Sequence, residues 1–252
     1  MKKCSICGKE YQKREIKVKD KVLYSLEVPV CDCEEKQRIR YEQIREEEQR
    51  KEKIEYKIRE LKRTLNCPIL TPFFENKTFS NFENLKAEES YKKNFLRCKE
   101  YAKDFKRGNK GLFMVGKVGT GKTTLQACIV KELEKRGFFC LLINFSTLLD
   151  LFIQSCTYEA KQSTFQLFNI ISNFDYVVLD DIGREKYTDK RLEFAFRIVD
   201  TLMNNLVTLS ITTNPECFNK LIKIEEYQAI LDRLNFMCPE IMSFENKSFR
   251  VM

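Results

Sequence analysis

The chain has 252 residues, of which 43% are hydrophobic, and it carries a formal net charge of +8 with no histidine. This length fits one large domain, or one domain with a smaller attachment, and the apolar content is sufficient for a sizeable core. Mechanisms that need an imidazole base are excluded, and the longest apolar runs fall short of the roughly 20 residues that a membrane-spanning helix needs. Because no apolar signal region opens the chain, we expect a cytoplasmic protein that does not enter a membrane.

The positive charge lies in the first part of the chain. Residues 1–110 hold 29 Lys and Arg against 20 Asp and Glu, a balance of +9, whereas residues 111–252 hold 16 against 17, a balance of −1. A basic region favours an acidic partner, so the first part is the better candidate for such contacts.

Two closely spaced cysteine pairs open the chain. Cys4 and Cys7 form a CxxC motif followed by glycine, and Cys31 and Cys33 follow after an interval of 23 residues. Imperfect alternation of apolar residues in the interval predicts a hairpin that returns the second pair to the first. Four thiolates complete a tetrahedral Zn²⁺ site, and so small a segment needs such a site to hold its shape. We therefore predict a zinc-binding module over residues 1–33, with free thiols in a disordered leader as the alternative.

The other seven cysteines are single. The odd total of 11 argues against a disulfide framework. We expect these residues to be small buried hydrophobic side chains: Cys67, Cys98, Cys128, Cys140, Cys156, Cys217 and Cys238.

Residues 34–66 are predicted to form a long charged helix and a linker. Of the 30 residues from 34 to 63, 20 are charged, and neither proline nor glycine interrupts them. One face of the last three turns carries Ile54, Ile58, Leu61 and Leu65. So narrow an apolar face fits either a spacer or an arm that binds a partner.

Residues 67–252 are predicted to form one α/β domain. A linker over 67–76 contains two prolines and leads into a phenylalanine-rich strip, Phe73 to Phe82, that is too apolar for a free tether. We expect this strip to pack along the domain, and a helix to follow over 87–107.

Residues 116–123 fit the phosphate-binding pattern GxxxxGK[ST]. A strand predicted over 111–115 precedes them and a helix predicted over 124–136 follows, which is the setting that this loop requires. Glycines let backbone N–H groups converge on phosphate oxygens, and the helix adds the positive end of its dipole. Lys122 brings a charge to the outer phosphates, and the Thr123 hydroxyl is a ligand for Mg²⁺. The predicted nucleotide-binding residues are Gly116, Lys117, Val118, Gly119, Thr120, Gly121, Lys122, Thr123 and Thr124.

Strands and helices alternate after this loop. Alternation of this kind predicts a parallel sheet with helices on both faces, in which ligands bind at the carboxyl ends of the strands. The predicted strands cover 138–145, 175–181, 207–213 and 240–244, and the predicted helices cover 148–153, 164–171, 190–204 and 224–235.

Two carboxylates and an amide follow the predicted strands. Asp180 and Asp181 end an apolar strand, where one carboxylate completes the Mg²⁺ shell and the next polarises an attacking water. An ordinary Asp-Asp turn is the alternative. Asn214 ends the neighbouring strand, where its amide would orient water against the γ-phosphate; a plain turn asparagine is the alternative.

Arg233 is a candidate arginine finger. It lies in a predicted helix and would act on the nucleotide of the next subunit in an assembly of identical chains. A local salt bridge with Asp232 or Glu226 is the alternative.

Taken together, these motifs resemble the DnaC/DnaI/IstB-like group of AAA+ ATPases. The closing Ser248-Phe249-Arg250 resembles the terminal Ser-Tyr-Arg of the group. The cysteine-bearing leader and Phe79-Ser80-Asn81-Phe82 look like its phage and bacterial helicase loaders. The motifs that occur in the order seen in this group are residues 116–124, 179–183, 211–214 and 232–234.

The resemblance implies a P-loop NTPase fold of the AAA+ type, without the usual helical lid because the chain ends just after its last predicted strand. Asp181 stands where many AAA+ proteins have Glu, and this shorter arm suits a slow ATPase that works as a switch. The resemblance gives roles to six residues: Lys122 and Thr123 at the nucleotide and Mg²⁺, Asp180 at the metal, Asp181 at the attacking water, Asn214 at the γ-phosphate, and Arg233 in trans.

The resemblance also implies a loader that uses ATP to place a hexameric replicative DNA helicase on single-stranded DNA, with the N-terminal region binding the helicase. Single-stranded DNA is a second expected partner, although residues 144–173, the insertion that family members present to DNA, hold one lysine and no arginine. A transposition helper ATPase and a non-hydrolysing, nucleotide-bound adaptor are the alternatives. The cysteine leader favours the loader, because transposition helpers usually begin with a helical segment.

Overall fold

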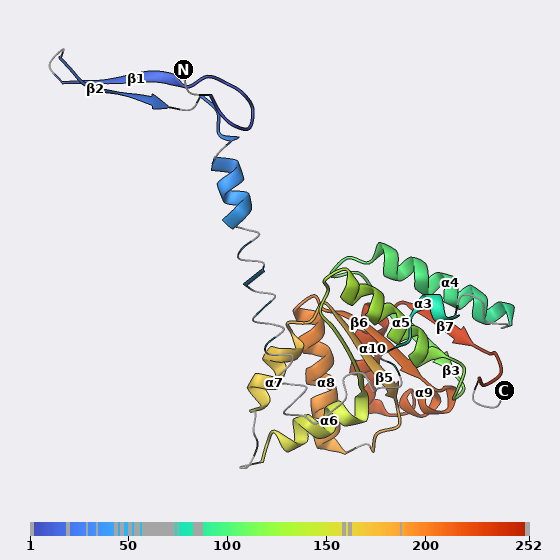
Figure 1. The fold of residues 1–252 in the computed structure, drawn as a ribbon. Helices are drawn as coiled ribbons and strands as arrows, with labels where there is room; N and C mark the ends of the chain where they lie inside the picture. Colours follow the sequence, from blue (N-terminus) through green and yellow to red (C-terminus); the bar gives the residue numbers. More distant parts are fainter. Residues whose placement is uncertain are drawn as a thin grey trace. The chain divides into compact units, whose positions relative to one another are not determined.

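The computed structural model describes residues 3–18, 21–28, 30–33, 35–42, 45, 48–49, 52, 56, 74, 76–82, 88–157, 160, 163–186 and 188–249. The chain divides into two units, Met1–Lys57 and Ile58–Met252 (Figure 1). The predicted apolar face at Ile54, Ile58 and Leu61 and the first part of the predicted linker lie outside the described residues. In the part of the chain that is described, no helix has the length and apolar character needed to cross a membrane.

A hairpin forms most of the first unit. Strand β1 (Gln12–Val18) pairs antiparallel with β2 (Lys21–Val28), and the register shifts by a bulge between Ile16 and Lys17. Antiparallel pairing brings the residues before β1 close to the residues after β2. The predicted hairpin is confirmed, and it returns the second cysteine pair to the first.

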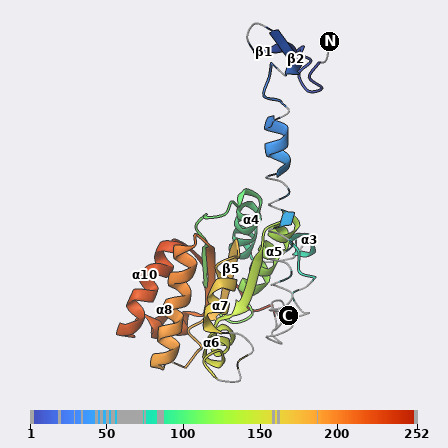
Figure 2. The same ribbon diagram turned by 90° about the vertical axis from the view of Figure 1, so that its left-hand side faces the viewer.

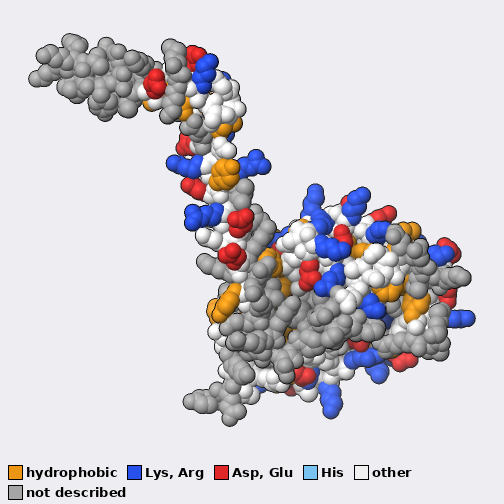
Figure 3. All heavy atoms as spheres, viewed as in Figure 1, with side chains coloured by type: hydrophobic (Ala, Val, Ile, Leu, Met, Phe, Trp, Pro, Cys, Tyr) orange, Lys and Arg blue, Asp and Glu red, His pale blue; other side chains and the backbone are white. Residues whose placement is uncertain are grey.

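The described residues between 35 and 56 are all helical. The described part of this segment carries Lys, Arg and Glu side chains, so charges of both signs occur on it (Figure 3). Lys36 pairs with Asp32 at 2.6 Å and Arg38 with Glu42 at 3.7 Å, both at the i,i+4 spacing. Such exposed pairs add only about 0.3–0.5 kcal/mol each, so this helix depends on many of them.

The second unit is built on a five-stranded parallel sheet with the order β4-β5-β6-β3-β7. The predicted parallel sheet is therefore confirmed. Because β3, β6 and β5 are neighbours, the loop after β3 and the residues that end β5 and β6 meet at one edge of the sheet. The strands are β3 (Leu112–Gly116), β4 (Cys140–Asn144), β5 (Tyr176–Ile182), β6 (Thr208–Thr213) and β7 (Glu240–Phe244).

Helices cover both faces of this sheet, as predicted. Side chains alternate along each strand, so Leu112 and Met114 pack in one cluster with α3, α4 and α5, whereas Phe113 packs in another with α6 to α10. Figure 2 shows α8 and α10 on one side of the sheet and α4 and α5 on the other. The helices are α3 (Phe79–Phe82), α4 (Glu89–Asp104), α5 (Lys122–Lys135), α6 (Phe145–Gln154), α7 (Thr164–Ile171), α8 (Asp189–Asn204), α9 (Pro215–Leu221) and α10 (Gln228–Met237).

Several helices differ from the prediction, including the one predicted over 224–235, where a 3-10 turn (Glu225–Tyr227) precedes α10. Strand β4 ends at Asn144 because the Asn144 side chain accepts a hydrogen bond from the N–H of Thr147, at 3.4 Å, and so caps α6. Phe145 therefore begins a helix instead of ending the strand. Helix α9 was not predicted, although Pro215 at its first position is a residue that favours a helix start.

The phenylalanine-rich strip packs along the domain, as predicted for its described members. Phe79 is buried and meets Phe95 of α4 edge to face, with ring centroids 5.6 Å apart. Phe74 and Phe82 pack against the same cluster, and Phe73 lies outside the described residues.

The single cysteines are mostly buried. Cys98, Cys128, Cys140 and Cys238 are buried, and burial raises the pKa of each thiol. The prediction is wrong for Cys156, which is exposed because it follows the last turn of α6. Cys217 is half-buried and Cys67 lies outside the described residues.

Candidate nucleotide-binding site and cysteine cluster

The loop between β3 and α5 has a backbone that glycine alone adopts easily. Gly119 and Gly121 have φ angles of 81° and 96°, in the left-handed region. A Cβ on Gly121 would lie 2.8 Å from the ring of Tyr91, and one on Gly116 would lie 2.5 Å from the carbonyl oxygen of Phe244. The glycines of the motif therefore serve both the turn and the close packing around it.

Lys122 folds back over this loop. Its Nζ donates to the carbonyl oxygens of Gly116, at 2.6 Å, and Lys117, at 2.9 Å, and the residue is only 5% exposed. Thr120 also donates its hydroxyl to the Lys117 carbonyl, at 2.8 Å. Since α5 begins at Lys122, the N–H groups of its first turn and the ammonium lie at the same end of the helix, where an anion is favoured.

Thr123 and Asp180 lie together, as a shared Mg²⁺ site requires. The Thr123 hydroxyl donates to Asp180 Oδ1 at 2.8 Å, and the Thr212 hydroxyl donates to the same oxygen at 2.7 Å. Burial raises the pKa of Asp180, and these hydroxyl hydrogen bonds oppose that shift. A hydroxyl beside a carboxylate is a donor set that fits Mg²⁺.

Asp181 has an unusual backbone for its residue type. Its φ is 58°, and the pairing of β5 with β6 is irregular between Leu179 and Ile182. A left-handed residue other than glycine costs about 1–2 kcal/mol, and such strain gathers at functional sites. The Asp181 N–H donates to the Thr212 hydroxyl at 2.9 Å, and its side chain lines the pocket described below.

Asn214 directly follows β6, and its side chain connects the phosphate-binding loop to Arg184. With the amide oriented so that both of its atoms are satisfied, its nitrogen donates to the Gly116 carbonyl at 3.0 Å. Its oxygen then accepts from Arg184 NH2 at 3.1 Å and from Nε at 3.3 Å. In the opposite orientation the oxygen accepts from Lys122 Nζ at 3.4 Å. In either orientation the amide joins the phosphate-binding loop to the end of β6.

Lys122, Thr123 and other loop residues line one pocket of about 400 Å³, together with Asp181 and Asn214. One part of its wall is polar and consists of the loop with Asp181, Arg184 and Asn214. The remainder is largely aromatic and consists of residues outside the predicted motifs of the site: Phe74, Lys77, Phe82, Tyr91 and Phe249. A pocket with one polar and one aromatic part suits a nucleotide, whose phosphates are charged and whose base is flat and aromatic.

The end of the chain contributes to this aromatic part. The Phe249 N–H donates to the carbonyl of Gly119 at 2.9 Å, and its ring meets Tyr91 edge to face at 4.8 Å. Asn246 donates its side-chain amide to the carbonyl of Thr120 at 3.3 Å. The segment after β7 is therefore hydrogen-bonded to the phosphate-binding loop.

The predicted residues contribute in different ways. Val118, Gly119, Gly121, Lys122, Thr123 and Thr124 line the pocket, together with Asp181 and Asn214. Gly116, Lys117 and Thr120 contribute backbone or side-chain hydrogen bonds within the loop.

Arg233 is not among the pocket residues. Its Nε donates to Asp200 of α8 at 3.0 Å, and its guanidinium lies 4.2 Å from the centroid of the Phe196 ring. The Arg233 side chain therefore forms an ion pair with an aspartate of another helix, and not with Asp232 or Glu226.

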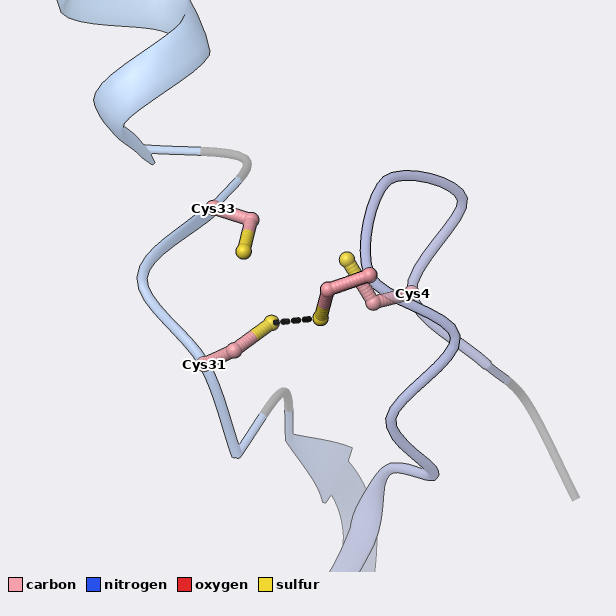
Figure 4. A group of neighbouring side chains, drawn as sticks. Cys4, Cys31 and Cys33 are labelled. Atoms are coloured by element: carbon pink, nitrogen blue, oxygen red, sulfur yellow. Dashed lines mark hydrogen bonds between the residues drawn. The ribbon is translucent and has the colours of Figure 1, made fainter.

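The four cysteines of the first unit form a second site. Their sulfur atoms all lie within 4.8 Å of one another (Figure 4). Those of Cys7 and Cys31 are 3.4 Å apart. A tetrahedral Zn²⁺ with Zn–S bonds of about 2.3 Å places its sulfurs about 3.8 Å apart, so the cluster fits that ion.

A tight turn presents the first pair. Gly8 has a φ of 73°, its N–H donates to the Cys4 carbonyl at 3.0 Å, and the Cys4 N–H donates to the Lys9 carbonyl at 2.9 Å. A hydrogen bond from the backbone N–H of Lys9, followed by one from Cys31, lowers the pKa of Cys7 to about 7. The turn thus favours a thiolate at Cys7, which is the form that binds zinc, whereas the neighbouring Cys7 and Cys31 side chains raise the pKa of Cys33.

Comparison with known proteins adds a family. The family model described as IstB-like ATP binding protein matches residues 27–252. The replicative helicase loader DnaC of Escherichia coli K12 is 31% identical over 159 residues, which cover 61% of this chain and 62% of the loader. The chain therefore matches less than two thirds of that relative's length.

Two solved structures are similar in fold. The crystal structure of the DnaC helicase loader superposes with a TM-score of 0.57 at 22% identity, covering 69% of this chain and 99% of the other. The crystal structure of DnaI gives a TM-score of 0.57 at 18% identity, covering 71% and 93%. At these identities the similarity establishes the fold of the second unit.

Proposed function

This chain belongs to the family of IstB-like ATP-binding proteins, and from that membership we propose that it is an ATP-dependent loader of a replicative DNA helicase. The observation that carries the proposal is the meeting of Thr123, Asp180, Asp181 and Asn214 at one edge of the sheet beside the phosphate-binding loop. The similarity to a replicative helicase loader supports the biological role.

In the proposed reaction a water molecule attacks the γ-phosphorus of ATP, and the bond from that phosphorus to the bridging oxygen of ADP breaks. Asp181 accepts the proton of the water, and Asn214 orients the water against the phosphate. Lys122 holds the outer phosphates. Thr123 and Asp180 would hold Mg²⁺, which when bound would neutralise charge on the phosphates. Because the aspartate arm is short, we expect hydrolysis to be slow and to serve as a switch.

The first unit is the proposed helicase-binding part. Its cysteine cluster, loaded with zinc, would hold the hairpin in one shape, because a two-stranded hairpin alone is marginally stable. The charged helix that follows offers a solvated surface of both signs. A folded module next to a charged helix is suited to binding another protein without burying a large core.

Two finer parts of the proposal concern the assembly. Self-association would place Arg233 at the nucleotide of a neighbouring subunit, and this requires the side chain to leave Asp200. Single-stranded DNA is the proposed destination of the helicase and a second proposed partner of this chain.

A transposition helper ATPase is a second candidate, because the matching family is described as IstB-like and the IstB-like group includes such helpers. The two candidates differ in the partner. Purified chain is immobilised and offered a purified hexameric replicative helicase or a transposase–DNA complex. We expect the helicase to bind wild type and the control Cys156→Ser and to be lost with Cys31→Ser. Binding of the transposase complex alone would reject the loader.

Single-turnover hydrolysis separates both candidates from a non-hydrolysing adaptor. Loss of a general base lowers a rate by about 10²–10⁴-fold, so Asp181→Asn is expected to hydrolyse ATP at least about 100-fold more slowly than wild type. Equal and negligible rates for the two proteins would favour the adaptor.

A further inference from the structure

Arg184 is a cation at the pocket that no motif assigns. It follows Gly183, whose φ of 96° turns the chain back after β5. Its NH1 lies 3.4 Å from Asp181 Oδ2, and its NH2 and Nε face the Asn214 oxygen at 3.1 and 3.3 Å. The guanidinium is thus in contact with both groups that are proposed to handle the water and the γ-phosphate.

The surroundings of Arg184 leave it able to change partner. Its side chain is 46% exposed and that of Asp181 is 25% exposed, so water screens their pair and the pair is weak. The planar guanidinium fork matches phosphate oxygens in a bidentate manner, and a terminal phosphate carries more charge than one carboxylate. A phosphate at this wall of the pocket would therefore compete well with Asp181 for the guanidinium.

We propose that Arg184 binds the terminal phosphate of ATP in the pocket of its own chain and, in doing so, releases Asp181 to accept the proton of the attacking water. Arg184 then distinguishes ATP from ADP, because ADP offers no γ-phosphate to replace Asp181. This inference rests on the proposed nucleotide function and adds to it a cation that acts in cis. Arg233, held by Asp200, remains the candidate for contact between subunits.

The variants Arg184→Ala and Arg184→Lys test this, with Lys186→Ala as the matched control. Lys186 is an exposed cation two residues further along that does not line the pocket, so its removal changes the net charge equally. Calorimetry measures the affinity of each protein for ADP and for a non-hydrolysable ATP analogue, with Mg²⁺ present.

A charge-assisted hydrogen bond contributes about 1.5–3 kcal/mol, which corresponds to about 10- to 100-fold in affinity. We expect Arg184→Ala to bind the ATP analogue about 10- to 100-fold more weakly and ADP within about twofold of wild type. Arg184→Lys should lie between, because it keeps the charge and loses the fork, and Lys186→Ala should match wild type. The ADP affinity also reports that the variant is folded.

Three results would overturn the inference. Arg184→Ala binding both nucleotides as wild type does, or losing both equally, would show that the side chain does not recognise the γ-phosphate. A selective loss that disappears on about hundredfold dilution of the protein would place the contact in trans. If wild type bound neither nucleotide, the proposed function itself would fail, whereas the other outcomes leave it intact.

Discussion

Gly121→Ala should damage both the stability of the second unit and its nucleotide affinity. Gly121 has a φ of 96°, and a Cβ there would lie 2.8 Å from Cε2 of the Tyr91 ring. Tyr91 is 2% exposed and also contacts Phe249, so it cannot move away without disturbing the aromatic part of the pocket. Gly108 provides a matched control, because it has a φ of 83° and an added Cβ would meet nothing within 4 Å.

The two substitutions share one cost and differ in another. An alanine with a left-handed backbone lowers the free energy of unfolding by about 1–2 kcal/mol. Alanine also reduces the conformational entropy of the unfolded chain, which raises the free energy of unfolding by about 0.4–1 kcal/mol. Gly108→Ala should therefore lower the free energy of unfolding by about 1 kcal/mol. Gly121→Ala adds the overlap with Tyr91, for which overpacking of a core costs about 1–3 kcal/mol. Its total is about 2–4 kcal/mol.

Differential scanning calorimetry of the full chain measures the first effect. For a domain of 150–250 residues, each kcal/mol lowers Tm by about 2–4 °C. We expect about 2–4 °C for Gly108→Ala and about 5–15 °C for Gly121→Ala. Titration with ADP below the transition measures the second effect, with at least about tenfold weaker binding for Gly121→Ala and unchanged binding for Gly108→Ala. Equal shifts in Tm, with wild-type ADP affinity in both, would refute the packing argument.

Lys122→Ala should abolish detectable ATP binding in a calorimeter. Lys117→Ala should retain it, because Lys117 accepts hydrogen bonds through its backbone carbonyl, which alanine keeps. Equal affinities of the two variants would contradict the assignment. Elemental analysis should find one Zn²⁺ per chain in wild type and Cys156→Ser, and a loss of most of it in Cys33→Ser; zinc retained there would remove Cys33 from the site. Burial raises the pKa of Glu185, so its contribution to stability is present below its ordinary pKa and is lost as the pH rises through the raised value. Glu185→Gln should therefore gain stability relative to wild type as the pH rises from about 4.5 to 7.5, and urea denaturation that finds a constant difference would contradict this.

The phosphate half of the site could be predicted because its signals are local. Lys122 and Thr123 follow a glycine pattern between an apolar strand and a periodic helix, and Asp180 ends a second apolar strand. In a parallel sheet the carboxyl ends of neighbouring strands meet, so these residues converge without any knowledge of loops.

The aromatic half of the pocket could not be predicted in this way. Phe74, Tyr91 and Phe249 come from three separate segments, and only tertiary packing brings them to one wall. The place of Arg184 at the pocket could not be predicted either. The course of the chain before it includes the left-handed residues Asp181 and Gly183, and no local sequence pattern indicates that backbone. The partner of Arg233 lies on another helix, 33 residues earlier in the chain.

The hydrogen bonds from Phe249 to Gly119 and from Asn246 to Thr120 have a practical consequence for anyone who produces this protein. A stop codon introduced before residue 246 would remove both of these hydrogen bonds and would also remove the Phe249 ring from the pocket wall. Weak nucleotide affinity in such a shortened protein would therefore reflect the lost segment and not a defect in the phosphate-binding loop itself.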